Sequence, residues 1–315
     1  MEILPYQDWM RPQVIAMFVD EYGVIADDFE KLFTDFYESA FQEGKCIRIV
    51  AVEGDKVGGF QSFFYWPISI NGEKKYTLQS GNSLVHPDFR GKGLFAKMLD
   101  YIHLPENNYN VDGLIGFPVQ MSYNSFIRNK WSNPFNLQWY VKPINPLLSL
   151  FSSAEDKLSQ QFGPRKAMTI VNSETFARIE QSEAFDGYRF AFQQGTYWRY
   201  LFTQGEETCL FEFKIQIRKK WIQELVIGKC VPSSYDESFI TKAFFSFTKE
   251  IQRTTSVTLM SFACNPLVSV YTRVMRNTGF RKIDKSIYFI TKGKIANYTT
   301  DWSNWDIQRG DIDTW

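Results

Sequence analysis

The spacing of hydrophobic and polar residues changes along the first half of the chain and predicts its secondary structure. Apolar residues that recur every three or four positions, as at Val14, Met17 and Phe18, indicate helices, whereas apolar runs bounded by turns indicate strands. The turns Glu53–Lys56 and Asn71–Lys74 suit hairpins, because their Gly residues tolerate a positive φ. The expected elements are helices over 11–22, 27–41, 94–102 and 122–131, three strands within 46–85, a strand over 113–119 and a closing strand.

The second half repeats this order of elements. Phe211, Phe213, Ile215 and Ile217 alternate with polar residues, which predicts a half-buried strand. Residues Ser234–Glu237 have the spacing of a capping box and are expected to open a helix. The other expected elements are an antiparallel return strand over 223–230, strands over 256–264 and 285–293, and a helix over 265–280.

The two halves also match in spacing, which predicts two copies of one unit. Val85 and Trp131 are 46 positions apart, and Val231 and Phe280 are 49 positions apart. A chain of 315 residues exceeds the size at which single cores usually stop growing, so two domains are expected. The predicted units are a first domain over 1–142, a linker over 143–165 that is rich in Pro, Ser and polar residues, and a second lobe over 166–315.

Composition narrows the class of protein. Hydrophobic residues make up 44% and charged residues 22%, as in an ordinary globular protein. The 35 basic and 35 acidic residues cancel, so no electrostatic case exists for nucleic acid or an anionic membrane as partner. No signal peptide and no apolar run of membrane-spanning length is visible, and the four cysteines follow no metal-ligand spacing. We therefore expect a cytoplasmic protein with buried thiols and no metal.

The stretch Gly81–Phe95 carries the clearest chemistry. It places Arg90, Gly91, Lys92 and Gly93 where a predicted strand gives way to a predicted helix. Successive N–H groups at a helix N-terminus, a positive field and glycines that let the backbone approach a ligand together suit a pyrophosphate. The alternative is a solvated turn, but the strand before the loop and the amphipathic helix after it favour an anion site.

This stretch resembles the acyl-CoA-binding signature of the GNAT superfamily of N-acyltransferases, Arg/Gln-x-x-Gly-x-Gly/Ala. Arg90, Gly93 and Phe95 occupy the defining places, and Phe95 stands where the family usually has Gly or Ala. Residues 116–131 resemble the family's second cofactor strand and the helix after it. The resemblance implies an α/β fold of two GNAT-like lobes, each a mostly antiparallel sheet with a central parallel pair, flanked by helices.

The resemblance also implies roles for particular residues. The pantetheine arm of acetyl-CoA or another acyl-CoA would enter a gap between the parallel strands, and the N–H of Val85 would act as an oxyanion donor to the thioester. A bulge within Ser80–Asn82 would open this gap, although a plain strand is an equal alternative. The expected cofactor-binding residues are Ser83, Leu84, Val85, Arg90, Gly91, Lys92, Gly93, Leu94, Phe95 and Asn124.

Groups for proton transfer are harder to assign. Many relatives use a Tyr where this chain has Phe126, so Tyr123 or Ser122 is the candidate acid. The candidate base lies in the C-terminal tail, at Asp311, Asp313 or the carboxylate of Trp315, since some two-lobed relatives fold their C-terminus back for this purpose. A tail that is only packed or frayed is the competing expectation.

The second half lacks the phosphate loop. Residues Val231–Phe239 contain two acids and neither Arg nor Gly, so this lobe is not expected to bind acyl-CoA. It would instead brace the first lobe and wall the acceptor cleft, where Thr196–Tyr200 could contribute or could belong to the core.

The expected activity is transfer of an acetyl or similar acyl group to a primary amine by direct attack in a ternary complex, and the resemblance suggests an amino sugar as the acceptor. A peptide or protein amine is an alternative acceptor. The rival hypotheses are a non-catalytic acyl-CoA-binding module, a structural scaffold, and transfer from aminoacyl-tRNA, which the balanced charge disfavours.

Overall fold

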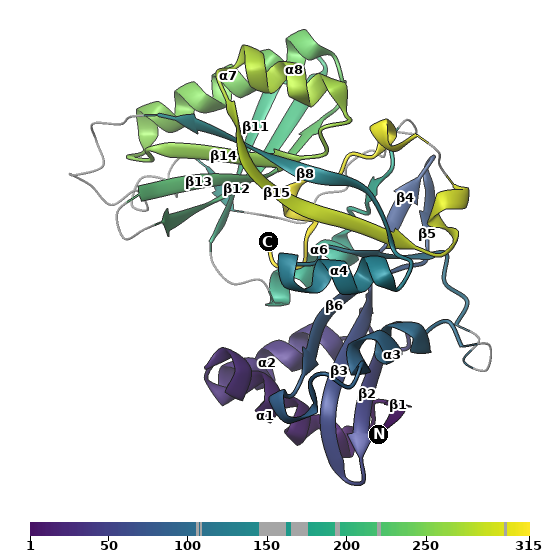
Figure 1. The fold of residues 1–315 in the computed structure, drawn as a ribbon. Coiled ribbons are helices and arrows are strands. Elements are labelled where there is room, and N and C mark those ends of the chain that lie inside the picture. Colours follow the sequence, from purple (N-terminus) through teal and green to yellow (C-terminus); the bar gives the residue numbers. More distant parts are fainter. Residues whose placement is uncertain are drawn as a thin grey trace.

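The computed structural model of this chain describes residues 1–104, 107, 109–144, 162–164, 176–192, 196–218, 222–298 and 301–315. Most of the predicted linker, and the start of the predicted second lobe, lie outside these residues. Figure 1 shows helices α1 to α3 around the first strands at one end of the molecule, and α7 and α8 around later strands at the other. The C-terminus lies between these two parts.

The elements of the first half follow the predicted order with two additions. The strand at the N-terminus was not expected. A small hairpin of two additional strands lies between the second and the third of the three strands expected before the phosphate loop. The elements are β1 (Glu2–Pro5), α1 (Arg11–Tyr22), α2 (Ala26–Tyr37), β2 (Ile47–Glu53), β3 (Lys56–Tyr65), β4 (Ile68–Ile70), β5 (Glu73–Lys75), β6 (Thr77–Val85), α3 (Leu94–Tyr101), β7 (Gly113–Gly116), α4 (Gln120–Arg128) and β8 (Ser132–Pro143).

The second half repeats this order. Its described elements are β9 (Gly163–Pro164), β10 (Arg178–Ile179), α6 (Glu183–Phe192), β11 (Tyr197–Gln204), β12 (Glu207–Arg218), β13 (Ile222–Pro232), α7 (Glu237–Thr254), β14 (Leu259–Cys264), α8 (Ser269–Asn277) and β15 (Arg281–Lys292). Short 3-10 turns follow β15 and lead to Trp315. None of the helices described is long and apolar enough to cross a membrane.

One twelve-stranded sheet runs through both halves in the order β1-β2-β3-β6-β7-β15-β8-β14-β13-β12-β11-β9. Two neighbouring pairs are parallel, β6–β7 and β13–β14, and the other strand pairings described for this sheet are antiparallel. This confirms the predicted fold class, in which each unit is mostly antiparallel around a central parallel pair.

The last strand of each half pairs with strands of the other half. β8 lies between β14 and β15, and β15 lies between β7 and β8. The two parallel pairs are therefore joined through exchanged strands, which the sequence did not indicate. The division at residues 142 and 166 stays a prediction, because the main sheet continues across it.

Helices cover the sheet on both faces in the first half. Residues of α1, α2 and α6 form a core with Phe60 and Phe64 on one face, whereas residues of α3 and α4 form another core with Phe63 and Leu78 on the opposite face. In the second half, α7 and α8 pack on β12, β13 and β14. The core on the α1–α2 face also includes Trp305, Ile307, Ile312 and Trp315, so the C-terminal segment is packed rather than frayed.

The turn Asn71–Lys74 forms a hairpin, as expected, but the hairpin joins β4 and β5 in a separate sheet with β10, because β3 ends at Tyr65, just before Pro67. Two expectations about element ends were wrong. Helix α2 ends at Tyr37 rather than at Phe41. Helix α7 begins at Glu237 with Asp236 as its N-cap, so the capping residue is the Asp and not Ser234.

Candidate active site

The parallel pair of the first half separates partway along its length. Strand β6 runs from Thr77 to Val85 but pairs with β7 only from Thr77 to Ser80, where β7 ends at Gly116. Its other edge stays paired with β3 as far as Val85. The segment Gly81–Val85 thus has one open edge, on the side from which β7 has departed.

A β-bulge lies at the start of this open edge. Phe60 pairs with Leu84 and Ser62 pairs with Gly81, so Asn82 and Ser83 together face the single residue Gln61. Asn82 has a positive φ of 51°. The bulge expected within Ser80–Asn82 is therefore present, centred on Asn82 and Ser83.

Gly81 has a packing role beside this bulge. A Cβ at Gly81 would lie 2.7 Å from Cε1 of Phe64, closer than real side chains approach. Glycine thus allows the Phe64 ring to pack against the strand at the point where the bulge begins.

Polar side chains fix the bulge. The Ser62 hydroxyl donates to the carbonyl of Gly81 at 2.7 Å, and the Ser83 hydroxyl donates to the Gln61 side chain at 2.5 Å. The Asn82 amide donates to the Tyr37 hydroxyl, which also contacts Ser62 at 3.1 Å. Burial raises the pKa of Tyr37, so this hydroxyl is neutral. The network holds the open edge in one conformation.

The amide of Val85 faces the open edge. The N–H of His86 donates to the carbonyl of Gly58 at 3.0 Å, which makes His86 and Leu84 the hydrogen-bonded positions of the antiparallel ladder with β3. Val85 lies between them, so its N–H and carbonyl point away from β3. Its carbonyl accepts a hydrogen bond from Nε of Arg90 at 3.0 Å, and its N–H points toward the gap, as an oxyanion donor must.

The loop after β6 forms a concave set of N–H groups. Gly91 and Gly93 have positive φ values of 80° and 70°, and Gly93 is the N-cap of α3 without a side-chain cap. In the part of the chain that the structure describes, the N–H groups of residues 91–95 donate to no acceptor. Lys92 is exposed beside them, and Arg90 pairs with Glu21 at 2.7 Å. This geometry can hold a phosphate through several N–H donors and the Lys92 ammonium, whereas Glu21 balances the charge of Arg90.

The corresponding position of the second half is closed by its own side chains. The Asp236 carboxylate accepts from the N–H of Phe239 at 2.8 Å and so caps α7. Glu237, the first residue of that helix, pairs with Arg273 at 2.5 Å. Two carboxylates therefore lie at the N-terminus that would face a phosphate, and the absence of acyl-CoA binding by this lobe stays a prediction.

The second parallel pair also has an open edge, and the C-terminal segment fills it. Strand β13 pairs with β14 only up to Ile227. Beyond that point, the amide side chain of Gln308 accepts from the N–H of Cys230 at 2.7 Å and donates to the carbonyl of Cys230 at 2.8 Å. Farther along the segment, the Trp315 ring lies on Gly228. The Gln308 side chain thus bonds to the open edge of β13, whereas among the described residues the open edge of β6 carries only the bond from Arg90 to the Val85 carbonyl.

The residues expected on α4 are placed as follows. The Tyr123 hydroxyl donates to Asn133 at 3.1 Å and its ring stacks on Tyr288 with centroids 4.0 Å apart. The Ser122 hydroxyl bonds to the carbonyl of Val119 at 3.2 Å, within its own turn. Asn124 is exposed. Tyr123 and Ser122 therefore make local hydrogen bonds, and a part for either in proton transfer stays a prediction.

The two departures from the family signature contact each other. The rings of Phe95 and Phe126 meet edge to face with centroids 5.3 Å apart, and Phe126 packs on Trp131 at 5.0 Å. The Phe95 ring thus lies against α4, as its place on the apolar face of α3 predicts, and its N–H lies in the first turn of α3, at the end of the loop. Lys130, which replaces the usual Gly, adopts a positive φ of 60°.

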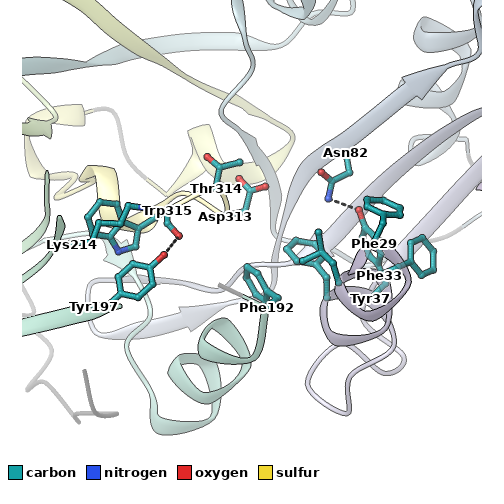
Figure 2. Close-up of a pocket in the computed structure, with 12 residues that line it drawn as sticks. Phe29, Phe33, Tyr37, Asn82, Phe192, Tyr197, Lys214, Asp313, Thr314 and Trp315 are labelled. Atoms are coloured by element: carbon teal, nitrogen blue, oxygen red, sulfur yellow. Dashed lines mark hydrogen bonds between the residues drawn. The ribbon is translucent and has the colours of Figure 1, made fainter. Parts of the chain in front are cut away.

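A cavity of about 400 Å³ lies between α2, the bulge of β6 and the C-terminal segment. Figure 2 shows Asp313 and Thr314 between the aromatic side chains of α2 on one side and Tyr197, Lys214 and Trp315 on the other. The lining residues are Phe29, Leu32, Phe33, Phe36, Tyr37, Asn82, Phe192, Tyr197, Lys214, Asp313, Thr314 and Trp315. We call it the aromatic cavity. Sequence reasoning identified Asp313, Trp315 and the Tyr197 region, but not α2 or Phe192.

Asp313 links the aromatic cavity to β6. Its carboxylate accepts from the Gln79 side chain at 2.7 Å, and Gln79 lies on β6 two residues before Gly81. Burial raises the pKa of Asp313, while the hydrogen bond from Gln79 and the nearby Arg309 oppose that shift. Tyr197 donates to the main-chain oxygen of Trp315 at 2.8 Å, across the cavity from β6 (Figure 2). Asp313 is therefore the carboxylate next to the open edge.

A second cavity of about 620 Å³ lies beyond the C-terminal segment. It is bounded by the β7–α4 turn, by Trp139 of β8 and by the start of β15, including Asp284 and Lys285, and it shares Thr314 with the aromatic cavity. The Lys285 ammonium lies 3.9 Å from the centroid of Trp139.

A splayed parallel pair, with a bulge on one strand and an N–H nest after it, defines the fold of the GNAT acyltransferases, here in two lobes. Known structures agree. The chain is similar to a GCN5-related N-acetyltransferase from Anabaena variabilis (TM-score 0.64, 9% identity, covering 92% of this chain and 72% of that one). It is also similar to a probable N-acyltransferase from Enterococcus faecalis (TM-score 0.60, 10% identity, covering 96% of this chain and 75% of that one). A third similar structure is N-myristoyltransferase from Saccharomyces cerevisiae (TM-score 0.50, 11% identity, covering 93% of this chain and 83% of that one).

Sequence comparison adds no closer relationship. No protein-family model matches the chain, and no curated protein matches it. At these identities the structural likeness shows the fold, and the activity has to be argued from the site.

Proposed function

We propose that this protein transfers an acyl group from acyl-CoA to a primary amine. The observation that carries the proposal is the open edge of β6. It begins beside Asp313 and the aromatic cavity, runs through Gly81–Val85 and ends at the N–H nest of residues 91–95. A thioester held along it would have its phosphates at one end and an acceptor at the other.

Each part of acyl-CoA has a matching group. The pyrophosphate would lie on the N–H groups of residues 91–95, with Lys92 and Arg90 beside it. The pantetheine amides would pair with the open edge at Ser83 and Val85. The second lobe supports this assignment, because the Gln308 amide makes this kind of contact with both main-chain groups of Cys230.

The chemistry would be direct transfer. The amine enters as an ammonium and gives one proton to the Asp313 carboxylate. Its nitrogen then attacks the thioester carbon, whose oxygen is stabilised by the N–H of Val85. The C–N bond forms, the C–S bond breaks, and the second amine proton passes to the leaving sulfur. The products are an amide and CoA thiol, and Asp313 returns its proton to solvent.

Asp313 suits the role of base better than Trp315 does. Its carboxylate lies beside β6, and burial raises its pKa toward the range in which a carboxylate accepts a proton more readily. The family's acid position is Phe126, which cannot donate a proton, so the thiolate would leave without an acid from α4.

An acetyl group and a small amine acceptor are the first substrates to test. A longer acyl chain and a peptide amine are the alternative substrates, because the similar structure of yeast N-myristoyltransferase contains bound myristoyl-CoA. One observation favours a non-catalytic acyl-CoA-binding protein, namely the Phe95–Phe126 contact where an acid would stand. That alternative predicts binding of acyl-CoA without release of CoA thiol in the presence of any amine.

The test is calorimetric titration of acetyl-CoA into the wild type, Gly93→Asp and Gly205→Asp proteins. Gly93 and Gly205 are both exposed, both have a positive φ and both have open space where a Cβ would lie, so the two substitutions cost the backbone the same. Only Gly93→Asp places a carboxylate in the nest. We expect it to abolish binding and Gly205→Asp to leave binding unchanged. Equal binding by all three proteins, or no binding by the wild type, would overturn the proposal.

A further inference from the structure

We infer that the aromatic cavity takes an amine with an apolar body, such as an arylalkylamine, rather than a hydroxylated amine such as an amino sugar. The inference rests on the proposed function and specifies its acceptor. Its basis is the side chains that line the cavity, the hydrogen bonds they already make, and the position of Asp313.

The walls of the cavity are mainly aromatic and aliphatic carbon. Six aromatic side chains other than Tyr37, together with Leu32, face a volume of about 400 Å³, within the range of about 300–1,000 Å³ that holds small molecules. The aromatic six are Phe29, Phe33, Phe36, Phe192, Tyr197 and Trp315. They come from α2, α6, β11 and the C-terminal segment, so an apolar body would be enclosed from several sides.

The polar groups of the cavity are largely engaged within the protein. The Tyr37 hydroxyl contacts Ser62 and accepts from Asn82, and the Tyr197 hydroxyl donates to the main-chain oxygen of Trp315. A sugar would bring several hydroxyl groups out of water with few partners to replace it, which is unfavourable. An apolar body loses no hydrogen bonds on entering.

One side-chain carboxylate, that of Asp313, lies among the described lining residues, and the main-chain oxygen of Trp315 already accepts from Tyr197. An ammonium bound to it would lie close to aromatic rings, and both the charge and the ring faces attract an organic cation. Because Asp313 bonds to Gln79 on β6, the bound nitrogen would lie next to the open edge, where the thioester carbon is expected.

The other apolar occupant to consider is a long acyl chain. The Asp313 carboxylate disfavours it, since a hydrocarbon chain would bury this charge further and offer it neither an opposite charge nor a hydrogen bond. An amine with an apolar body meets Asp313 with an opposite charge and the rings with carbon. We therefore assign the cavity to the acceptor.

The experiment measures binding of phenethylamine, 2-phenylethanol and glucosamine to the full chain by calorimetry, with acetyl-CoA and octanoyl-CoA titrated into the same samples. Asp313→Asn keeps the shape of the side chain and removes its charge. Asp284→Asn is the matched control, because it makes the same change at an exposed carboxylate on the second cavity. Leu32→Trp, at a half-buried wall position on α2, fills the aromatic cavity without touching Asp313.

We expect phenethylamine to bind at least about tenfold more tightly than glucosamine. Asp313→Asn should weaken phenethylamine about tenfold and leave 2-phenylethanol unchanged, whereas Leu32→Trp should weaken both. Asp284→Asn should change neither.

Three results would overturn the inference: tighter binding of glucosamine, no binding of phenethylamine, or octanoyl-CoA that binds much more tightly than acetyl-CoA and excludes phenethylamine. Acetyl-CoA binding distinguishes a failure of the acceptor assignment from a failure of the proposed function. If acetyl-CoA binds and phenethylamine does not, the acceptor assignment fails and the proposed function stands. If phenethylamine binds through Asp313 and no acyl-CoA binds, the cavity assignment holds and the proposed acyl transfer fails.

Discussion

Replacing Gly228 by Ala tests whether the C-terminal segment is seated as the structure shows. A Cβ at Gly228 would lie 2.2 Å and 2.3 Å from Cζ2 and Cε2 of Trp315, well inside van der Waals contact. The Trp315 ring is 2% exposed, and Tyr197 packs on it with ring centroids 5.6 Å apart. A methyl group at this position must therefore shift the ring or expel it.

The structure sets the size of the effect. Forcing a methyl group into a packed site costs about 1–3 kcal/mol. Expelling the ring would cost about 4–6 kcal/mol, since an indole buries about 150–250 Å² at about 25 cal/mol per Å². Because the protein adopts the less costly of the two arrangements, we expect Gly228→Ala to lower the free energy of unfolding by about 1–3 kcal/mol. The cost of expelling the ring, about 4–6 kcal/mol, is the upper limit.

The assay is urea unfolding followed by tryptophan fluorescence, together with the amine and acetyl-CoA titrations. Gly187→Ala is the control, because Gly187 lies in helix α6 with open space around it and should gain about 0.5–1 kcal/mol from the same added methyl group. We expect Gly228→Ala to weaken phenethylamine and leave acetyl-CoA unchanged. An unaltered unfolding midpoint with unaltered amine binding would show that Trp315 does not lie on Gly228, and would refute the placement of the segment.

Three further predictions concern titration and capping. Burial raises the pKa of Asp313, and an ammonium needs its ionised form, so phenethylamine affinity should fall as the pH drops through a value above the ordinary aspartate range; calorimetry across pH should show this in the wild type and not in Asp313→Asn. Burial raises the pKa of the Cys230 and Cys264 thiols, so a disulfide reagent should label these two residues only after unfolding, and rapid labelling of either in the native protein would contradict their burial. Asp236→Ala should cost about 0.5–2 kcal/mol in urea unfolding through loss of the α7 cap, without creating a second acetyl-CoA site by calorimetry.

Much of the first half could be predicted because its signals are local. The spacing of apolar residues predicted helices α1 and α3. The loop Arg90–Phe95 connects a strand to a helix with positive φ at both glycines, as its composition suggests. The bulge was expected near Gly81 because Gly often marks one, but the residue with positive φ is Asn82, which also tolerates that conformation.

The aromatic cavity could not be predicted, because its walls come from positions between Phe29 and Trp315 that only the folded chain brings together. The exchange of β8 and β15 escaped prediction for the same reason. Both strands have ordinary alternating patterns, and a pattern does not specify the partner strand.

The exchanged strands also constrain folding during synthesis, because strands of the first half must wait for partners from the second half. Strand β7 leaves the ribosome early, yet its second neighbour is β15, and both neighbours of β8 belong to the second half. The first partner of β8 to be made is β14, which ends at Cys264, 121 residues after Pro143, so β8 has no partner for roughly 6 to 24 s of synthesis. A fragment that stops at Pro143 would keep that exposed strand permanently, and unpaired edges of this kind favour aggregation. The first half would therefore need the second in order to be completed, even if it alone binds acyl-CoA.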